Sequence, residues 1–210
     1  MRRSYERVGI DIDDLGPDPL AAFRGWFAEA AGAGIVEPNA MVLATVGADG
    51  VPAARTVLLK GFDDAGLRFF TSLGSAKAAD LAANPVAALV FPWHAMSRQV
   101  RVVGAVEALD RDAVEAYFAV RPRESQLGAW ASAQSTVVGS RRALDDALAE
   151  VEARFPAEEG PVPAPPGWGG YRVVPTSWEF WAGRTGRLHD RLRYRRTPDG
   201  SSWLVERLAP

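Results

Sequence analysis

The sequence predicts a mainly β protein: an antiparallel barrel or closed sheet with flanking helices. Several β-rich segments follow one another between residues 40 and 107, and most are joined by hairpin turns such as Ala48-Asp49-Gly50. Neither a Gly-x-Gly-x-x-Gly motif nor a Walker-type loop is present, which argues against a doubly wound nucleotide-binding fold. The chain has 210 residues, enough for one sizeable core and short for two, so we expect one domain.

The N-terminal part predicts an arm followed by a helix. Residues 1–17 are mostly polar and predict a mobile arm, with a lid over a site as the less favoured alternative. Asp18 suits an N-cap and Pro19 the first helical position, and apolar residues then recur at helical spacing until Gly32. The single domain is therefore expected to span residues 18–210.

The next segments are predicted strands, with one helix among them. Strand-like patterns cover residues 41–46, 51–60, 67–71, 86–93 and 97–107. Ser75 is expected to cap a helix over residues 76–83, with Lys77 in its first turn. Free backbone N–H groups and the positive dipole end make such a turn a candidate phosphate site, although most such turns only cap a helix.

The C-terminal half contains two more predicted helices before the last strands. Asp110 is suited to cap a helix over residues 113–120, and an amphipathic helix is expected over residues 140–155. Residues 156–170 are rich in Pro and Gly and predict a long ordered loop. Strand patterns resume at residues 171–174, 178–181, 193–196 and 203–208, and these strands are expected to close the sheet.

The composition excludes several classes of function. A formal net charge of −2 argues against a general nucleic-acid or membrane-surface binder. The absence of cysteine excludes disulfides and thiolate chemistry, and two histidines make a histidine-rich metal site improbable, so no metal is expected. Redox chemistry must therefore come from an organic cofactor. The chain has no apolar leader and no run long enough to span a bilayer, so we expect a soluble cytoplasmic protein.

Three residues in the middle of the chain form a candidate phosphate site. Tyr117, Arg121 and Ser125 are spaced by four, which on an unbroken helix places a phenol, a guanidinium and a hydroxyl on one face. Pro122 disfavours helical geometry at Arg121, so the spacing indicates convergence rather than one helix face. The alternative is a helix-turn-helix held by local ion pairs.

A late basic stretch, Gly186 to Arg191, is a candidate anion site with a proton-handling group. In an extended chain Arg187, His189 and Arg191 share one face, and two permanent cations favour a neutral imidazole between them. A solvated charged strand, in which Asp190 and Glu179 offset the arginines, explains the same pattern. That simpler interpretation is favoured for the stretch taken alone.

Arg55 and Lys60 stand near the two ends of the second predicted strand. Regular alternation puts them on opposite faces, so one ligand contacts both only through a bend or an approach from the strand end. Otherwise they are flanking charges.

Sequence blocks along nearly the whole chain, in order and with matching spacing, resemble those of one enzyme family. They are Arg55 to Lys60, Phe70-Thr71, Phe91 to Trp93, Arg98 to Val100, Arg121 to Gln126, Gln134-Ser135, Trp168 to Gly170, Glu179 to Trp181, Arg187 to Arg191 and Arg207 to Pro210. Together they resemble the pyridoxamine 5′-phosphate oxidase family.

The resemblance implies a split-barrel flavoprotein, a homodimer with two FMN sites at the subunit interface. It implies a flavin-dependent pyridoxal 5′-phosphate synthase that oxidises pyridoxine or pyridoxamine 5′-phosphate to pyridoxal 5′-phosphate and reduces O₂ to hydrogen peroxide. The implied FMN-contacting positions are Arg55, Lys60, Phe70, Thr71, Lys77, Gln99, Gln134, Ser135, Trp181 and Arg191. The implied substrate positions are Lys60, Tyr117, Arg121 and Ser125 for the phosphate, Arg187 and His189 as the catalytic pair over the ring, and Arg2 and Tyr5 in a closing arm.

Two positions depart from the family pattern. Ala76 stands where the family commonly has an arginine on the FMN phosphate, so one charge-assisted contact is missing, with Arg55 and Lys77 left to supply it. Phe70 replaces a common tyrosine, which loses a hydroxyl and keeps the ring.

Other split-barrel functions are the competing interpretations. A phenazine-biosynthesis oxidase also uses FMN, but it has less need of Tyr117, Arg121 and Ser125. A protein that binds flavin, haem or pyridoxal phosphate without turnover has less need of Arg187 and His189. A deazaflavin-dependent reductase is a more distant alternative.

Overall fold

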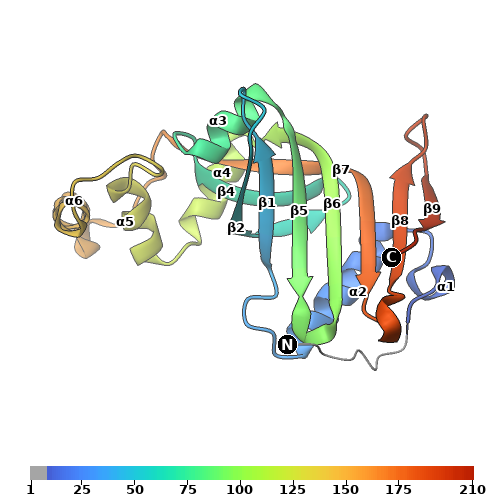
Figure 1. The fold of residues 1–210 in the computed structure, drawn as a ribbon. Helices are drawn as coiled ribbons and strands as arrows, with labels where there is room; N and C mark the ends of the chain where they lie inside the picture. The colour runs from blue at the N-terminus through green and yellow to red at the C-terminus, as the bar shows by residue number, and fades with distance from the viewer. Residues whose placement is uncertain (1–8) are drawn as a thin grey trace.

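A computed structural model describes residues 9–210, which form one nine-stranded antiparallel sheet with helices at its sides (Figure 1). The helices are α1 (Ile12–Leu15), α2 (Pro19–Gly32), α3 (Ala76–Ala83), α4 (Arg111–Ala119), α5 (Arg123–Ala131) and α6 (Arg141–Arg154), with 3₁₀ turns η1 (His94–Met96), η2 (Ala157–Glu159) and η3 (Thr185–Arg187). The strands are β1 (Ala40–Val46), β2 (Pro52–Leu58), β3 (Gly61–Asp63), β4 (Gly66–Ser72), β5 (Val86–Trp93), β6 (Arg98–Ala108), β7 (Trp168–Ala182), β8 (Asp190–Arg196) and β9 (Trp203–Arg207). The predicted mainly β architecture with flanking helices is confirmed.

The sheet curls because β7 pairs with two different strands along one of its edges. Its first half pairs with β4 and its second half with β8, while β6 pairs along its other side. Figure 1 shows β7 bending between these halves, so that β4 crosses behind β1, β5 and β6. Gly104 lies where the β6–β7 register shifts, and a Cβ there would lie 2.0 Å from the Val174 carbonyl oxygen. Glycine is therefore needed for the strands to approach at the bend.

Helix α2 covers the main core. Asp18 accepts a hydrogen bond from the Leu20 N–H at 3.0 Å and Pro19 begins the helix, as the sequence predicts. Phe23 is fully buried, with its ring centroid 4.9 Å from that of Phe91 and 5.3 Å from that of Trp178. Helix α2 is therefore part of the core. Truncating such a buried ring to alanine lowers the free energy of unfolding by about 3–5 kcal/mol.

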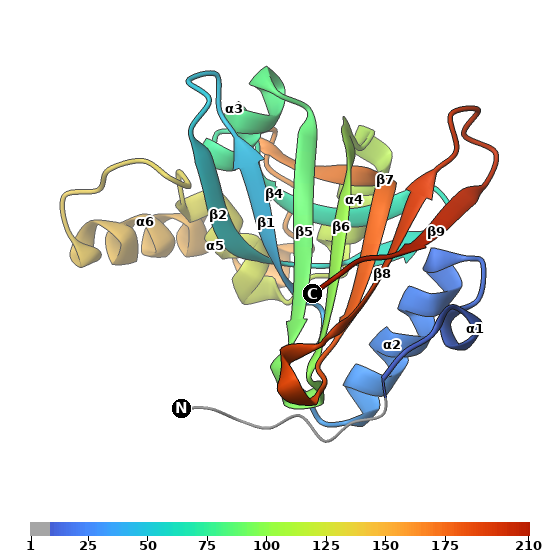
Figure 2. The same cartoon turned by 45° about the vertical axis from the view of Figure 1, so that its right-hand side comes forward.

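Residues 9–17 differ from the predicted mobile arm. Ile10 and Leu15 are buried in the main core, and the Ile10 N–H donates to Asp190 at 3.0 Å. Figure 2 shows α1 beside β8 and β9, where Arg207 donates to the Ile10 carbonyl at 3.1 Å. The buried Ile10 and Leu15 side chains, and the hydrogen bonds of Ile10 to Asp190 and Arg207, hold this segment against the sheet. The first eight residues of the predicted arm, with Arg2 and Tyr5, lie outside the described residues.

The Tyr194 phenol gives a stability signature at alkaline pH. It is buried and donates to the Gly16 carbonyl at 2.7 Å, and burial, with a smaller effect of Asp18, raises its pKa from 10.0 to about 12. Because the unfolded chain ionises this phenol first, stability is full below pH 10 and is lost as pH rises toward 12. In urea titrations the wild type should lose roughly 2 kcal/mol more than Tyr194→Phe between about pH 8 and about pH 12. Parallel losses in the two proteins would contradict this assignment.

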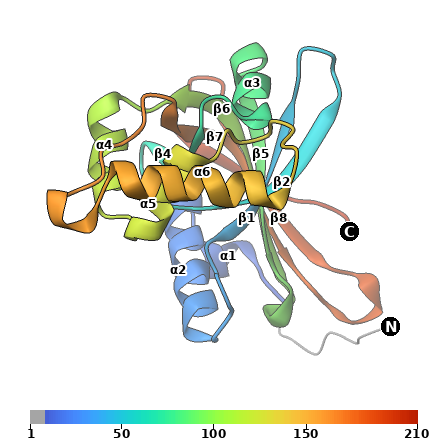
Figure 3. The same ribbon diagram turned by 90° about the vertical axis from the view of Figure 1, so that its left-hand side faces the viewer.

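A second apolar cluster packs among the helices α4, α5 and α6. Val114, Phe118, Leu127, Val162 and Trp168 are buried together, and α6 packs against them through partly buried side chains. Figure 3 shows α6 lying across α5, on the same side of the molecule as α4. The predicted strands at 171–174 and 178–181 belong to one continuous strand, β7. No helix within residues 9–210 combines the length and apolarity needed to cross a bilayer.

Candidate functional site

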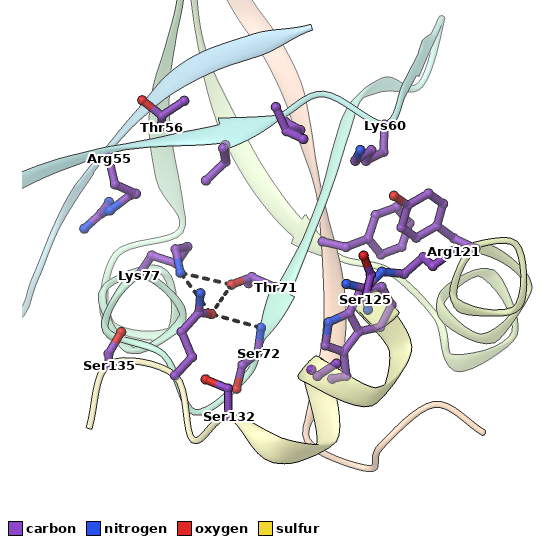
Figure 4. A pocket seen from close by; sticks show the side chains of 18 of the residues that line it. Arg55, Thr56, Lys60, Thr71, Ser72, Lys77, Arg121, Ser125, Ser132 and Ser135 are labelled. Carbon is purple, nitrogen blue, oxygen red and sulfur yellow. Dashed lines mark hydrogen bonds between the residues drawn. The ribbon is translucent and has the colours of Figure 1, made fainter. Parts of the chain in front are cut away.

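A pocket of about 890 Å³ opens between β2, β4 and the helices α3, α4 and α5 (Figure 4). Its lining consists of Arg55, Thr56, Val57, Leu58, Lys60, Phe70, Thr71, Ser72, Ala76, Lys77, Tyr117, Arg121, Pro122, Ser125, Gly128, Ala129, Ser132, Gln134, Ser135 and Trp168. Among residues 9–210, the lining contains four cationic side chains and no carboxylate. Such a cavity favours an anionic ligand.

One group of polar side chains surrounds Lys77, and we call it the α3 group: Arg55, Thr71, Lys77, Gln134 and Ser135. Lys77 is only 7% exposed, and its ammonium donates to the Thr71 hydroxyl at 3.0 Å and the Gln134 amide oxygen at 3.3 Å. Burial lowers its pKa from the ordinary value, and the Arg55 charge lowers it further. Neither the Thr71 hydroxyl nor the Gln134 amide is anionic, so an anion here would stabilise the buried charge.

Asp80 orients Arg55 from behind the pocket. The carboxylate lies 3.4 Å from the guanidinium and accepts a hydrogen bond from the Thr45 hydroxyl at 2.6 Å. Lys77 occupies the first turn of α3, as predicted. Ser75 is the N-cap residue, but its hydroxyl makes no capping bond and lies 3.4 Å from the Thr71 hydroxyl.

A second group lies on the α4–α5 side, and we call it the α4–α5 group: Lys60, Tyr117, Arg121 and Ser125. All four line the same pocket, and Figure 4 shows Lys60, Arg121 and Ser125 apart from Arg55 and Lys77. Helix α4 ends at Ala119 and α5 begins at Arg123, so the chain turns at Pro122. Tyr117, Arg121 and Ser125 do converge on one pocket, across a turn between two helices, and their role in phosphate binding stays a prediction.

Arg55 and Lys60 reach one pocket despite the alternation rule. Strand β2 ends at Leu58, and the Lys60 N–H already pairs with the Arg68 carbonyl of β4 at 2.8 Å. The chain therefore changes direction between the two cations, which is the bend that a shared ligand requires.

Three stacked rings line the pocket, and one of them, Trp168, belongs to the second apolar cluster. The Phe70 ring lies 4.0 Å from Tyr117 and 5.4 Å from Trp168, with interplanar angles of 13° and 5°. Phe70 also lines the pocket, and its contact with FMN stays a prediction. Trp168, Ser72 and Ser132 also line it and were missed as site residues. A tryptophan directly before Gly169-Gly170 was the one available signal, since paired glycines allow close packing.

The remaining predicted side chains lie elsewhere. Gln99, Trp181 and Arg191 occupy one row across β6, β7 and β8, because Gln99 pairs with Trp181 and Trp181 with Arg191. With Arg187 and His189 they form what we call the β8 group, and none of the five lines the pocket of its own chain. Figure 1 shows the turn between β7 and β8 at the lower right of the molecule, whereas α4 and α5 lie to the left.

The extended geometry predicted from Arg187 to Arg191 is wrong at its first half. Thr185–Arg187 form a 3₁₀ turn, Arg187 has a φ of 64°, and β8 begins only at Asp190. The reason is the β7–β8 hairpin, which must reverse the chain between Ala182 and Asp190. A left-handed conformation at a non-glycine residue is strained and is concentrated at functional sites.

Hydrogen bonds fix His189 and Arg191. The Arg184 backbone N–H donates to His189 Nδ1 at 3.1 Å, so a neutral imidazole carries its proton on Nε2. The imidazole also lies 4.7 Å from the Trp181 ring, between centroids. Arg191 donates to Glu179, which is 4% exposed, at 2.9 Å, and this bond raises the pKa of the guanidinium. The alternative interpretation, in which carboxylates offset the arginines of this stretch, thus holds in part, because Glu179 pairs with Arg191.

Comparisons with known proteins find relatives over the whole chain. Residues 27–155 match the family model "Pyridoxamine 5′-phosphate oxidase", and residues 168–210 match "Pyridoxine 5′-phosphate oxidase C-terminal dimerisation region". A pyridoxine/pyridoxamine 5′-phosphate oxidase of Nocardioides sp. is 56% identical over 210 residues, covering 100% of this chain and 96% of that protein. One of Salinispora arenicola is 56% identical over 211 residues, covering 100% and 95%.

Two solved structures share the fold. PhzG from Burkholderia lata, in complex with tetrahydrophenazine-1-carboxylic acid, superposes with a TM-score of 0.89 at 31% identity, covering 99% of this chain and 100% of that chain. A pyridoxamine 5′-phosphate oxidase-related, FMN-binding protein of Nostoc punctiforme has a TM-score of 0.71 at 22% identity, covering 90% and 97%, and supports the fold alone. The curled antiparallel sheet is thus a split barrel. The chain belongs to the pyridoxine/pyridoxamine 5′-phosphate oxidase family.

Proposed function

We propose that this protein is an FMN-dependent oxidase that converts pyridoxine and pyridoxamine 5′-phosphates to pyridoxal 5′-phosphate, with O₂ reduced to hydrogen peroxide. One observation carries the proposal: two separate sets of cations and hydroxyls line one pocket that has no carboxylate in its lining. One phosphate-bearing ligand needs one such set. A flavin mononucleotide and a phosphorylated substrate, bound side by side, need both.

The α3 group fits the phosphate of FMN. Lys77 is buried beside hydroxyl and amide groups, and Arg55 is held toward the same space by Asp80. These two cations stand in for the arginine that Ala76 replaces. When bound, FMN supplies the hydride acceptor and the route of electrons to O₂ that no side chain of this protein provides.

The α4–α5 group fits the phosphate of the substrate. The Arg121 guanidinium has a buried Nη1 without a hydrogen-bond partner among the described residues. Burial also lowers its pKa from the ordinary value. A phosphate dianion would satisfy both deficits, with the Tyr117 and Ser125 hydroxyls and the Lys60 ammonium as further donors.

The β8 group is proposed to complete the site from a second copy of the chain. Its five members do not line the pocket of their own chain, and they lie in the segment that matches a dimerisation region, apart from Gln99 on the adjoining strand. In a homodimer with twofold symmetry each pocket would receive the partner's copy of this group. Gln99, Trp181 and Arg191 would then contact FMN, and Arg187 and His189 would lie over the substrate ring.

Arg187 and His189 are proposed to position the substrate rather than to act as an obligate acid and base. The Arg187 guanidinium would complement the charge of the substrate ring and orient it for hydride loss. His189 presents Nε2–H as a donor, because its Nδ1 already accepts from Arg184. That donor suits a substrate oxygen.

The decisive experiment is an oxidase assay on the purified protein. It should be yellow and should produce hydrogen peroxide and an aldehyde from pyridoxamine 5′-phosphate, in equal amounts. The same assay with a tetrahydrophenazine carboxylic acid separates this function from that of the phenazine-type relative. Turnover of the latter alone, or bound flavin without peroxide, would overturn the proposal.

A further inference from the structure

Arg121 is held by aromatic rings. Its Cζ atom lies 4.7 Å from the Trp168 ring centroid and 5.2 Å from that of Phe118. Trp168 is 7% exposed, so the contact lies largely out of water, where cation–π attraction is strongest.

The pocket's other arginine is held differently. Arg55 has the Asp80 carboxylate at 3.4 Å, which offsets part of its charge. Among residues 9–210, Arg121 has no ion pair of this kind, and its Nη1 is buried and unpartnered. A ring face fixes a guanidinium without cancelling its charge or occupying its N–H donors. The full charge and the donors of Arg121 therefore remain available to an anion.

The same indole also orients Tyr117. Phe70 stacks on both Trp168 and Tyr117, and the Tyr117 and Trp168 rings are 6.0 Å apart at an interplanar angle of 9°. A Cβ at Gly170 would lie 2.6 Å from the Phe70 ring, so the stack depends on glycine at that position. Arg121 and Tyr117 are thus both positioned by the Trp168 side chain, Arg121 by direct contact and Tyr117 also through Phe70.

Trp168 is itself clamped by Arg111. That guanidinium donates to the carbonyls of Ala164 at 2.7 Å, Pro165 at 3.0 Å and Trp168 at 3.3 Å. Three carbonyls on one side chain fix the end of the loop that leads into β7. The position of the indole is therefore set by the backbone as well as by the core around it.

We propose that Trp168 is a positioning residue for substrate binding: its ring holds the Arg121 guanidinium, and the Tyr117 phenol beside it, in place to receive the substrate phosphate. This inference rests on the proposed oxidase function. It concerns affinity for the phosphate and not the hydride transfer itself.

The test compares kcat and KM of the FMN-loaded enzyme for pyridoxamine 5′-phosphate. Trp168→Leu should raise KM about five- to thirtyfold with kcat within about twofold, and Trp168→Phe, which keeps a ring, should stay within about threefold of wild type. Arg121→Ala should raise KM about ten- to a hundredfold. In the Arg121→Ala background, Trp168→Leu should add little, because the cation that it holds is gone.

Two controls separate positioning from a general loss of structure. Trp203→Leu removes the ring of another arginine–tryptophan pair, 4.0 Å from Arg196 and outside the pocket lining, and should leave KM unchanged. Unphosphorylated pyridoxamine, used as substrate, should show the same KM with wild type and Trp168→Leu. An equal rise of KM in both arginine backgrounds, or an equal rise for pyridoxamine, would overturn the inference.

A second variant covers the case in which Trp168→Leu does not fold. Arg111→Ala removes the side chain that binds the three carbonyls. Because the Arg111 side chain is 42% exposed, its loss should leave the fold intact and raise KM several-fold with kcat preserved. An unchanged KM in Arg111→Ala would then contradict the positioning role. Wild-type protein without any turnover would instead contradict the proposed function, so the two failures are distinguishable.

Discussion

Two inactive variants of this protein are expected to restore activity when their chains are combined. One variant carries Arg55→Met and Lys77→Met and so lacks the two cations of the α3 group. The other carries Arg187→Ala and His189→Ala in the β8 group. In a mixed dimer one pocket combines both defects, while the other combines an intact pocket with an intact β8 group. Purified mixed dimers should therefore show about half of the wild-type activity, and a random mixture about a quarter.

The measurement needs two affinity tags, so that dimers with one chain of each kind are isolated after co-expression. A matched control combines the Arg55/Lys77 variant with Arg121→Ala/Ser125→Ala, in which both defects lie in the pocket lining. That pair leaves each site with one damaged pocket and should stay inactive. Mixed dimers as inactive as their parents would mean that each site is built within one chain.

Arg187→Ala alone is expected to lower kcat by about ten- to a hundredfold while FMN stays bound, since a charge-assisted contact is worth about 1.5–3 kcal/mol. Arg187 is exposed and lies outside the set of residues proposed for the flavin. The absorbance spectrum of the purified variant reports the flavin content, and stopped-flow reduction reports the hydride step.

Arg142→Ala is the matched control, because this arginine is exposed on α6 and lies outside the pocket lining. It should behave as wild type in both measurements. Loss of flavin from Arg187→Ala, with the reduction rate of the residual holoenzyme unchanged, would assign Arg187 to the cofactor instead of the substrate.

The sequence was sufficient for the elements whose signals are local. The helix start at Asp18 and Pro19, the Asp49-Gly50 turn and the Asp110 cap are decided by neighbouring residues, and each is found in the structure. The spacing of Tyr117, Arg121 and Ser125 also indicated their convergence, although Pro122 disfavours helical geometry at Arg121 and the turn itself was not specified.

The errors came from contacts between distant residues. Residues 9–17 look like a tail until Asp190 and Arg207 are placed beside Ile10. The turn at Arg187 depends on the β7–β8 register, which sequence alternation alone does not give. Trp168 carries no charged group that marks it as a site residue, and its importance follows from which guanidinium its ring faces.

The different supports of Arg55 and Arg121 imply different responses to ionic strength. An ion pair between partly exposed groups, such as that of Arg55 with Asp80, weakens as salt screens it, whereas a desolvated contact with ring faces is screened much less. Added electrolyte should thus loosen the anchor of one arginine before that of the other. The two phosphate sites of a single cavity would then lose their preorganisation at different salt concentrations.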